Sequence, residues 1–344
     1  MKRRSLGLLA LVGFCCMTVA RADTPEFGVA SAYNLVALTG DINDTSDITG
    51  RIAAAYKIDA STTIGSWLNG TTADPYASLA SGYAVVAGST INASNYFNIN
   101  GGGNVYQSYS SSTVNVNWNE SPKGTVVTGG TSPVNFAALT TTLDSLTAQL
   151  ASMTSNGTLC QFGGSGTCAP NASGAKNPSF LVLYGTSSTL NVFTVTAAQF
   201  SNQNSPLDIE VPVGSTVVIN VQGVADTLNT GIYYNGVQET DANASKILFN
   251  FANAQAVTID GQLDGSILAP YAYLTGTSQM GGTMIAASVG PTGEVHYDAF
   301  TGNVGLVATP EPASLALLGM GLLMIMGTLR YKMRSDDAAA TTKL

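Results

Sequence analysis

Charge and histidine are scarce in this chain of 344 residues. Charged residues make up 10% of it, and there is a single histidine. Between residues 23 and 308, five cations stand against eighteen acids, a net charge of −13, and Arg51 is the only arginine. A surface so poor in cations cannot neutralise phosphates, which argues against a nucleic-acid partner. It also argues against tight binding of strongly anionic polysaccharides, unless a divalent cation bridges the two. Low charge with abundant Gly, Ser, Thr and Asn is typical of exported β-rich proteins.

Cysteine is also rare. Cys15 and Cys16 lie in the N-terminal apolar run, so only Cys160 and Cys168 remain in the rest of the chain. In an oxidising compartment we expect these two to form a disulfide, and closing so short a loop is worth about 2–3 kcal/mol. A metal or redox pair is the alternative, but no histidine or third cysteine lies nearby and the spacing is not CxxC.

Long apolar runs occur only near the two ends. The N-terminal run, residues 6–19, follows three cations at residues 2–4. Ala20 and Ala22 then fit the small-x-small rule of a cleavage site. The sequence therefore predicts a signal peptide over residues 1–22 and export of the mature chain.

The C-terminal apolar run, residues 313–329, stands between two distinctive segments. Before it comes a proline-rich entry and after it a basic cluster: Pro310, Glu311, Pro312, then Arg330, Lys332, Arg334. At about 1.5 Å per residue the run is about 25 Å long, marginal for a hydrocarbon core of about 30 Å. The cations resist translocation and would stay in the cytoplasm. We expect a separate hydrophobic helix over 309–334 and a short polar tail over 335–344.

This order of segments resembles the PEP-CTERM sorting signal of Gram-negative bacteria. The resemblance implies recognition by an exosortase-type processing enzyme while the helix is transiently in the inner membrane. The protein would then be released to the cell surface or to the extracellular polysaccharide matrix. One departure is that the chain continues for ten residues after the basic cluster. An ordinary C-terminal membrane anchor is the alternative.

Residues 23–308 form the main domain and consist largely of short β-branched runs separated by glycine and asparagine turns. The runs that predict strands are 33–38, 50–56, 83–87, 113–117, 124–127, 180–184, 190–196, 216–222, 247–251 and 257–260. One interruption, residues 135–153, has apolar side chains every three or four positions. That spacing predicts a single helix whose apolar stripe packs on the β structure.

A Gly-x-Ile-x-Ala opening suggests how the strands are arranged. It occurs at Gly50 and Gly265, and a close variant starts at Gly282, 17 residues after Gly265. A short strand recurring at such a step predicts stacked coils, and we expect a mainly β fold, a right-handed parallel β-helix. A β-sandwich is the alternative, but it calls for two-residue hairpin turns, which are scarce here.

Further motifs carry a second resemblance. They are Tyr33-Asn34-Leu35-Val36, Gly40-Asp41, residues 46–53, and residues 293–297 within a closing segment 261–300. These look like the choice-of-anchor A domain, an adhesin-like bacterial surface domain, over most of residues 27–302. The order of coils, one helix and more coils is also similar to the discontinuous β-helix of bacterial ice-binding proteins. However, no repeated Thr-x-Thr set marks an ice-binding face.

Two clusters could carry chemistry. Glu294, His296 and Asp298 alternate, so in a strand they share one face, but the nucleophile and oxyanion donors of a hydrolase are missing around them. We expect a polar face on a terminal coil and no catalysis. A β-helical enzyme acting on polysaccharides is the alternative, although the lone Arg51 offers little to hold an anionic sugar.

The second cluster is acidic: Asp41, Asn43, Asp44 and Asp47, with Ser46 between them. Oxygen ligands at alternating positions suit calcium. The EF-hand pattern fails, because Ser46 occupies the position of the required glycine and Ile52 that of the glutamate. Turn-forming Asx residues explain the same letters without a metal. Calcium is thus a candidate ligand of this cluster, turn formation is the alternative, and no other cofactor is expected.

Together these patterns predict an exported, non-catalytic protein of the cell surface or extracellular matrix with an adhesin-like role. Its Ser, Thr, Asn and Tyr side chains would bind extracellular polysaccharide or surface proteins. An ice-binding protein and a passive structural matrix protein are further alternatives.

Overall fold

A computed structural model describes residues 26–305 of the chain, except residues 45, 61, 67, 69–73, 93–96, 110–113, 120–122, 162–179, 202–205, 230 and 239–242. The chain divides into two units after Val304, and the fold described below belongs to the first. The expected signal peptide, the C-terminal hydrophobic helix and the polar tail lie outside the described residues. Within the part of the chain that the structure covers, none of the helices combines the length and hydropathy of a membrane span.

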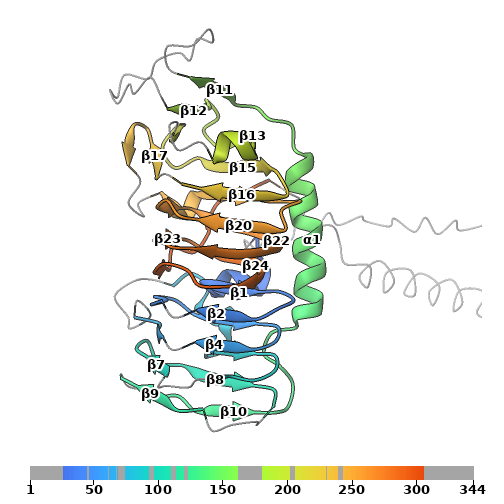
Figure 1. Ribbon diagram of the computed structural model, residues 1–344, viewed down its shortest axis with the longest axis vertical. Helices are drawn as coiled ribbons and strands as arrows, with labels where there is room; N and C mark the ends of the chain where they lie inside the picture. The colour runs from blue at the N-terminus through green and yellow to red at the C-terminus, as the bar shows by residue number, and fades with distance from the viewer. Residues whose placement is uncertain are drawn as a thin grey trace, which may run out of the picture. The chain divides into compact units, whose positions relative to one another are not determined.

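Parallel strands stacked one above another form the largest sheet, whose longest path we call the first face (Figure 1). Its order is β10-β8-β6-β3-β1-β24-β22-β19-β15-β13. The strands are β1 (Leu35–Ala37), β3 (Ile52–Ala54), β6 (Tyr83–Ala87), β8 (Asn104–Gln107), β10 (Val126–Thr128), β13 (Leu190–Thr196), β15 (Thr216–Gln222), β19 (Ile247–Asn250), β22 (Ser266–Gly276) and β24 (Met284–Val289).

Two further faces complete the coils near the middle of the stack. The second face joins the ends of β22 and β24 to β2 (Ile42–Asp44), β4 (Ile58–Ala60), β16 (Ala225–Leu228) and β20 (Ala256–Ile259). The third face holds β21 (Leu263–Asp264), β23 (Met280–Gly281), β25 (Val295–His296), β5 (Thr63–Ile64), β7 (Phe97–Ile99) and β9 (Val116–Trp118). Single bridges from Ile48 to Val295 and to Ile64 connect its two halves. These parallel pairings confirm the predicted parallel β-helix and exclude the sandwich.

A separate five-stranded sheet adds the only antiparallel pairs among the described strands. It runs β11-β12-β14-β17-β18, with β11 (Thr158–Gln161), β12 (Leu181–Tyr184), β14 (Leu207–Glu210), β17 (Ile232–Tyr234) and β18 (Val237–Gln238). The pairs β11–β12 and β17–β18 are antiparallel. Short helical turns complete the described elements: η1 (Gly28–Ala32), η2 (Ala77–Ala80), α2 (Ala197–Phe200) and η3 (Ala244–Lys246).

The stack is discontinuous in sequence. Strand β1 pairs with β24 in the register Leu35 to Met284, so the first coil lies against the last. From there β1, β3, β6, β8 and β10 lead to one end of the stack, α1 (Phe136–Ser152) runs back along it, and the later coils descend from β13 to β24 (Figure 1). We call the junction of β1 and β2 with β24 the seam. The first and last described segments of this unit lie side by side. Phe27 stacks on Phe300, and their ring centroids are 5.3 Å apart.

Inward side chains form continuous columns. One column on the first face runs through all ten strands as Phe193, Ile219, Phe249, Ile267, Met284, Leu35, Ile52, Val85, Val105 and Val126. A second column, two residues later in each strand, consists of Ala269, Ala286, Ala37, Ala54 and Ala87, all fully buried. Small side chains here leave room for the inward residues of the next face, so the chain can turn the corner.

Helix α1 covers the outer side of the first face, close to its predicted bounds of 135–153. The Asn135 side chain accepts a hydrogen bond from the Ala138 amide, which caps the first turn. Four leucines of the helix are buried: Leu139, Leu143, Leu146 and Leu150. Polar contacts fix its position, since Asn250 donates to the Thr147 carbonyl at 3.1 Å and Asn220 donates to the Leu150 carbonyl at 2.9 Å.

Candidate binding face

The outward side chains of the second face form a row in register that we call the ladder face. Along it Thr227 pairs with Thr258 and Thr258 with Thr275, while the neighbouring column holds Ala225, Ala256, Tyr273 and Ser288. The hydroxyls of Thr258 and Thr275 lie 3.4 Å apart. The row faces outward because the alternate residues Leu228, Val257, Ile259 and Leu274 are fully buried.

The ladder face changes character at the seam. Beyond it, Asn43 pairs with Asp59, and Lys57 contacts Asp59 at 2.6 Å in an ion pair. The coils after α1 therefore contribute uncharged threonine rungs, whereas the coils before α1 contribute amide and charged rungs. The two surfaces meet where β24 pairs with β2 through Val289 and Ile42.

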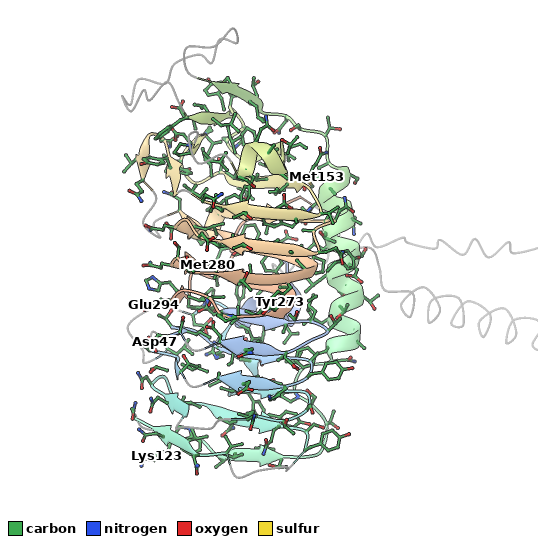
Figure 2. The ribbon with its side chains drawn as sticks, in the orientation of Figure 1. Asp47, Lys123, Met153, Tyr273, Met280 and Glu294 are labelled. Atoms are coloured by element: carbon green, nitrogen blue, oxygen red, sulfur yellow. The ribbon has the colours of Figure 1, made fainter. Side chains whose placement is uncertain are left out.

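A groove of about 500 Å³ lies across this meeting point, and we call it the seam groove. It is lined by Gly40, Asp41, Asn43, Tyr56, Tyr273, Ser288 and Val289. Tyr56 and Tyr273 are its two large side chains, and they are 59% and 47% exposed. Figure 2 labels Tyr273 at the level where the late coils meet the early ones, in the middle of the stack.

Two glycines leave room for side chains that line the seam groove. A Cβ atom added to Gly40 would lie 2.7 Å from the Cβ atom of Ser288. One added to Gly290 would lie 2.1 Å from the hydroxyl oxygen of Tyr273, so this hydroxyl rests over Gly290. Both separations are shorter than atoms tolerate, so a larger residue at Gly40 would meet the fixed Cβ atom of Ser288, and one at Gly290 would push the Tyr273 ring aside.

The acidic cluster named as a calcium candidate is distributed over neighbouring coils. Asp41 accepts a hydrogen bond from the Lys57 amide at 2.8 Å, and Asp47 accepts one from the Thr63 amide at 3.3 Å. Asp44 is buried and accepts bonds from the amides of Ser46 and Thr292. Within the ranges that the structure describes, no three His, Cys, Asp or Glu side chains converge as a metal ion requires. Calcium binding stays a prediction.

The single histidine lies on a different face from the ladder. His296 is on β25 of the third face, with its Nε2 atom 3.3 Å from Glu294 Oε1 and its Nδ1 atom 2.9 Å from Gln279 Nε2. Glu294 and Asp47 project from the side of the stack opposite α1 (Figure 2). Glu294 and His296 thus share one face, as the alternation predicts, and they form a polar contact on a late coil.

The remaining predicted site residues fall largely outside the described residues. Cys160 lies on β11 and is disulfide-bonded. Its expected partner, Cys168, is outside the described residues, so that pairing stays a prediction. The same holds for the cleavage residues Ala20 and Ala22 and for the whole sorting motif around Pro310 and Pro312.

Neither the threonine row nor the seam groove is evident in the sequence. The three threonines recur at steps of 31 and 17 residues, which hides them from a search for an even period. A weak signal is present, because Thr227, Thr258 and Thr275 each follow an alanine or tyrosine two positions earlier. The groove combines residues 40–56 with residues 273–289, so no local motif contains it.

Stacked parallel coils and a covering helix define a discontinuous β-helical domain. The sequence matches the family described as "Putative Ice-binding-like adhesive domain" over residues 26–297, and the chain belongs to that family. No curated protein sequence matches the chain significantly.

Several solved structures are similar to this chain. An ice-binding protein from an Arctic yeast is 14% identical with a TM-score of 0.36, covering 84% of this chain and 97% of its own. The ice-binding protein of the Antarctic ascomycete Antarctomyces psychrotrophicus is 8% identical, with a TM-score of 0.32 and coverages of 80% and 98%. A domain of an ice-binding protein from Shewanella frigidimarina is 14% identical, with a TM-score of 0.30 and coverages of 82% and 98%.

Proposed function

We propose that this protein is an exported, non-catalytic adhesive protein of the cell surface that binds its target through the ladder face. The observation that carries the proposal is the row of uncharged outward residues ending at a groove between two exposed tyrosines. Membership of an adhesive domain family supports it. The targets would be extracellular polysaccharide or the proteins of neighbouring surfaces.

The physical basis is a rigid array of weak contacts. Strands in a sheet lie about 4.8 Å apart, so the rungs repeat hydroxyl and methyl groups at that interval. The inward side chains behind them are fully packed, and little conformational entropy is lost when a ligand binds a surface already held in place. Each contact is weak, but a polymer that follows the row makes many of them.

Attachment of cells tests this role. Cells that display the chain should adhere to extracellular matrix more than cells that lack it. A charge placed in the row, Thr258→Lys, should reduce attachment severalfold because it must be desolvated against the target. The matched control Asn117→Lys puts the same charge on the exposed third face and should leave attachment unchanged. Equal attachment with and without the chain would refute the proposal.

The route to the surface is a second part of the proposal. Residues 309–344 would act as a PEP-CTERM signal that an exosortase-type enzyme recognises in the inner membrane, and the domain before it would be of the choice-of-anchor A kind. Fractionation of cells with and without residues 309–344 tests this, followed by mass spectrometry of the mature C-terminus. We expect the full chain at the surface with a shortened C-terminus. An intact C-terminus retained in the inner membrane would indicate a plain anchor.

Ice binding is a second candidate function, and the aligned Thr227, Thr258 and Thr275 favour it. Regularly spaced threonines offer hydroxyl and methyl groups to an ordered lattice of water. The full chain should then inhibit ice recrystallisation, and Thr258→Lys should abolish the effect while Asn117→Lys preserves it. Absence of inhibition at the highest soluble concentration would remove this candidate and leave the adhesive one.

Catalysis on polysaccharides is the remaining alternative. Incubation of the full chain with matrix polysaccharides, followed by a reducing-end assay, separates it from binding. We expect no increase in reducing ends over the buffer blank. Sustained turnover, lost on Glu294→Gln, would overturn the non-catalytic assignment.

A further inference from the structure

We infer that the seam groove binds a neutral polysaccharide strand, with sugar rings packed against Tyr56 and Tyr273. This inference rests on the proposed adhesive function and names the ligand class and the residues that recognise it. It is carried by three features of the groove, namely its exposed aromatic rings, its unused hydrogen-bonding groups and its charge.

The aromatic rings come from opposite sides of the seam. Tyr56 follows β3 in an early coil and Tyr273 lies on β22 in a late coil, and both line the groove. About half of each side chain is exposed although both are large and amphipathic. The face of such a ring carries partial negative charge and attracts the C–H bonds of a pyranose ring. Two rings at one open groove suit a chain of sugars better than a compact metabolite.

Polar groups in the seam groove are available to sugar hydroxyls. Among the described residues, none forms a hydrogen bond with the side-chain amide of Asn43, the Ser288 hydroxyl or the hydroxyls of Tyr56 and Tyr273. Asp41 uses its Oδ1 atom to accept the Lys57 amide, which leaves Oδ2 able to accept a further bond. Apolar rings combined with a few polar groups of this kind are typical of ligand sites.

Charge selects a neutral ligand. Asp41 is the charged residue in the lining of the groove, and residues 23–308 carry a net charge of −13. The backbone amide of Lys57 contacts Asp41, but the ammonium group of Lys57 forms an ion pair with Asp59. A uronic acid would therefore meet a carboxylate without a free cation to balance it. The hydroxyl groups of a neutral hexose can instead donate hydrogen bonds to the Asp41 carboxylate.

Calorimetric titration of the full chain with cellohexaose tests the inference, with maltohexaose as a second neutral probe and hexagalacturonate as the anionic one. We expect saturable binding of at least one neutral probe and none of hexagalacturonate. Tyr56→Ala and Tyr273→Ala should each weaken binding about tenfold, which corresponds to about 1.4 kcal/mol. Tyr56→Phe and Tyr273→Phe keep the rings and should retain most of the affinity.

Two further variants distinguish specific binding in the groove from nonspecific binding to any exposed tyrosine. Tyr109 is 66% exposed but does not line the groove, so Tyr109→Ala should leave affinity unchanged. Gly290→Ala keeps every side chain that lines the groove but pushes the Tyr273 ring aside, because the added Cβ atom would lie 2.6 Å from the ring atom Cζ, and it should weaken binding as Tyr273→Ala does. Thermal unfolding of each variant confirms that it is folded before titration.

The outcomes distinguish this inference from the proposed function. Three results would overturn the groove assignment. They are a loss of affinity in Tyr109→Ala equal to that in the groove variants, tighter binding of hexagalacturonate than of the neutral probes, and no saturable binding of either neutral probe. If wild-type cells attach but titration shows no saturable binding of either neutral probe, adhesion stands and the groove inference falls. If the chain confers no attachment but titration shows the expected pattern, the groove binds sugar and the adhesive function falls.

Discussion

The side-chain amide of Asn34 donates a 2.6 Å hydrogen bond to the backbone carbonyl of Gly282, which lies 248 residues further along the chain. The same amide donates to the carbonyl of His296 at 2.9 Å, and its oxygen accepts from the amide of Gly50 at 3.1 Å. One fully buried side chain thus joins two late coils to two early ones. It holds the seam from inside, and the seam groove lies on the outside of the same junction.

Removing this clamp should weaken the whole unit. Asn34→Ala deletes three hydrogen bonds and leaves buried backbone groups without partners, so the free energy of unfolding should fall by about 2–4 kcal/mol. Urea unfolding of the full chain measures the change. The control Asn117→Ala removes an exposed bond to Asn98 and should cost under about 0.5 kcal/mol. Equal effects of the two substitutions would contradict the role of Asn34.

Attachment of α1 should depend on Asn250. Its side chain exchanges hydrogen bonds with Thr147 on the helix and donates to Asn220 in the next strand at 2.8 Å. We expect Asn250→Ala to lower stability by about 2–3 kcal/mol and to speed amide exchange over residues 136–152 more than in the strands. Gln149→Ala is the control, because this side chain hydrogen-bonds to Ser145 of the same helix and not to a strand. Uniform exchange changes in the two variants would argue against a specific clamp.

The alanine column should not tolerate larger side chains. Ala286 is fully buried between Ala269 and Ala37 in adjacent strands. Ala286→Leu adds volume where coils on both sides are already packed, so we expect a loss of about 1–3 kcal/mol in thermal or urea unfolding. Ala148→Leu, at an exposed position of α1, should be close to neutral. A stable Ala286→Leu variant would show that the corner has spare room.

Asp226 should make stability depend on pH. Both of its carboxylate oxygens are buried and, among the described residues, have no hydrogen-bond partner. Burial raises the pKa of this carboxyl above its usual range, because the charged form is desolvated. The native state therefore binds this proton more tightly than the unfolded chain does. Protonated Asp226 therefore contributes fully to the free energy of unfolding below the unfolded pKa of about 3.9. This contribution is lost as the pH rises through the native pKa.

The substitution Asp226→Asn removes this titration. Its stability relative to the wild type should increase as pH rises from about 4 toward 7, by about 1.4 kcal/mol for each unit by which the native pKa exceeds the unfolded one. Urea unfolding of both proteins across this pH range measures the difference. A difference that does not change with pH would mean that the carboxyl titrates alike in the two states.

Local periodicity accounts for what the sequence could predict. The helix follows from apolar residues every three or four positions, and its observed bounds, Phe136–Ser152, lie within one residue of 135–153. The Gly-x-Ile-x-Ala openings also proved informative. Ile52, Ile267 and Met284 occupy one inward column, because a repeated opening places the same residue at the same point of each coil.

Relations between distant coils were beyond such reasoning. No residue near Leu35 indicates that it pairs with Met284. The order of the coils depends on α1, which carries the chain from one end of the stack to the other. The antiparallel pair β11–β12 follows the expected helix and has no repeat to mark it. The burial of Asp226 is not predictable from the sequence either, because a single acid between Ala225 and Thr227 is typical of a surface position and only the pairing register places it inward.

The stacked pair Phe27 and Phe300 and the bond from the Val304 amide to the Glu26 carboxylate, 3.1 Å long, keep both chain ends of the unit together. New coils inserted next to β10 or next to β13 would extend the stack at its far ends. Neither insertion would move these chain ends or the seam groove. The length of the stack and the position of its chain ends are therefore independent properties, and evolution or engineering can change the first without moving the chain ends or the seam groove.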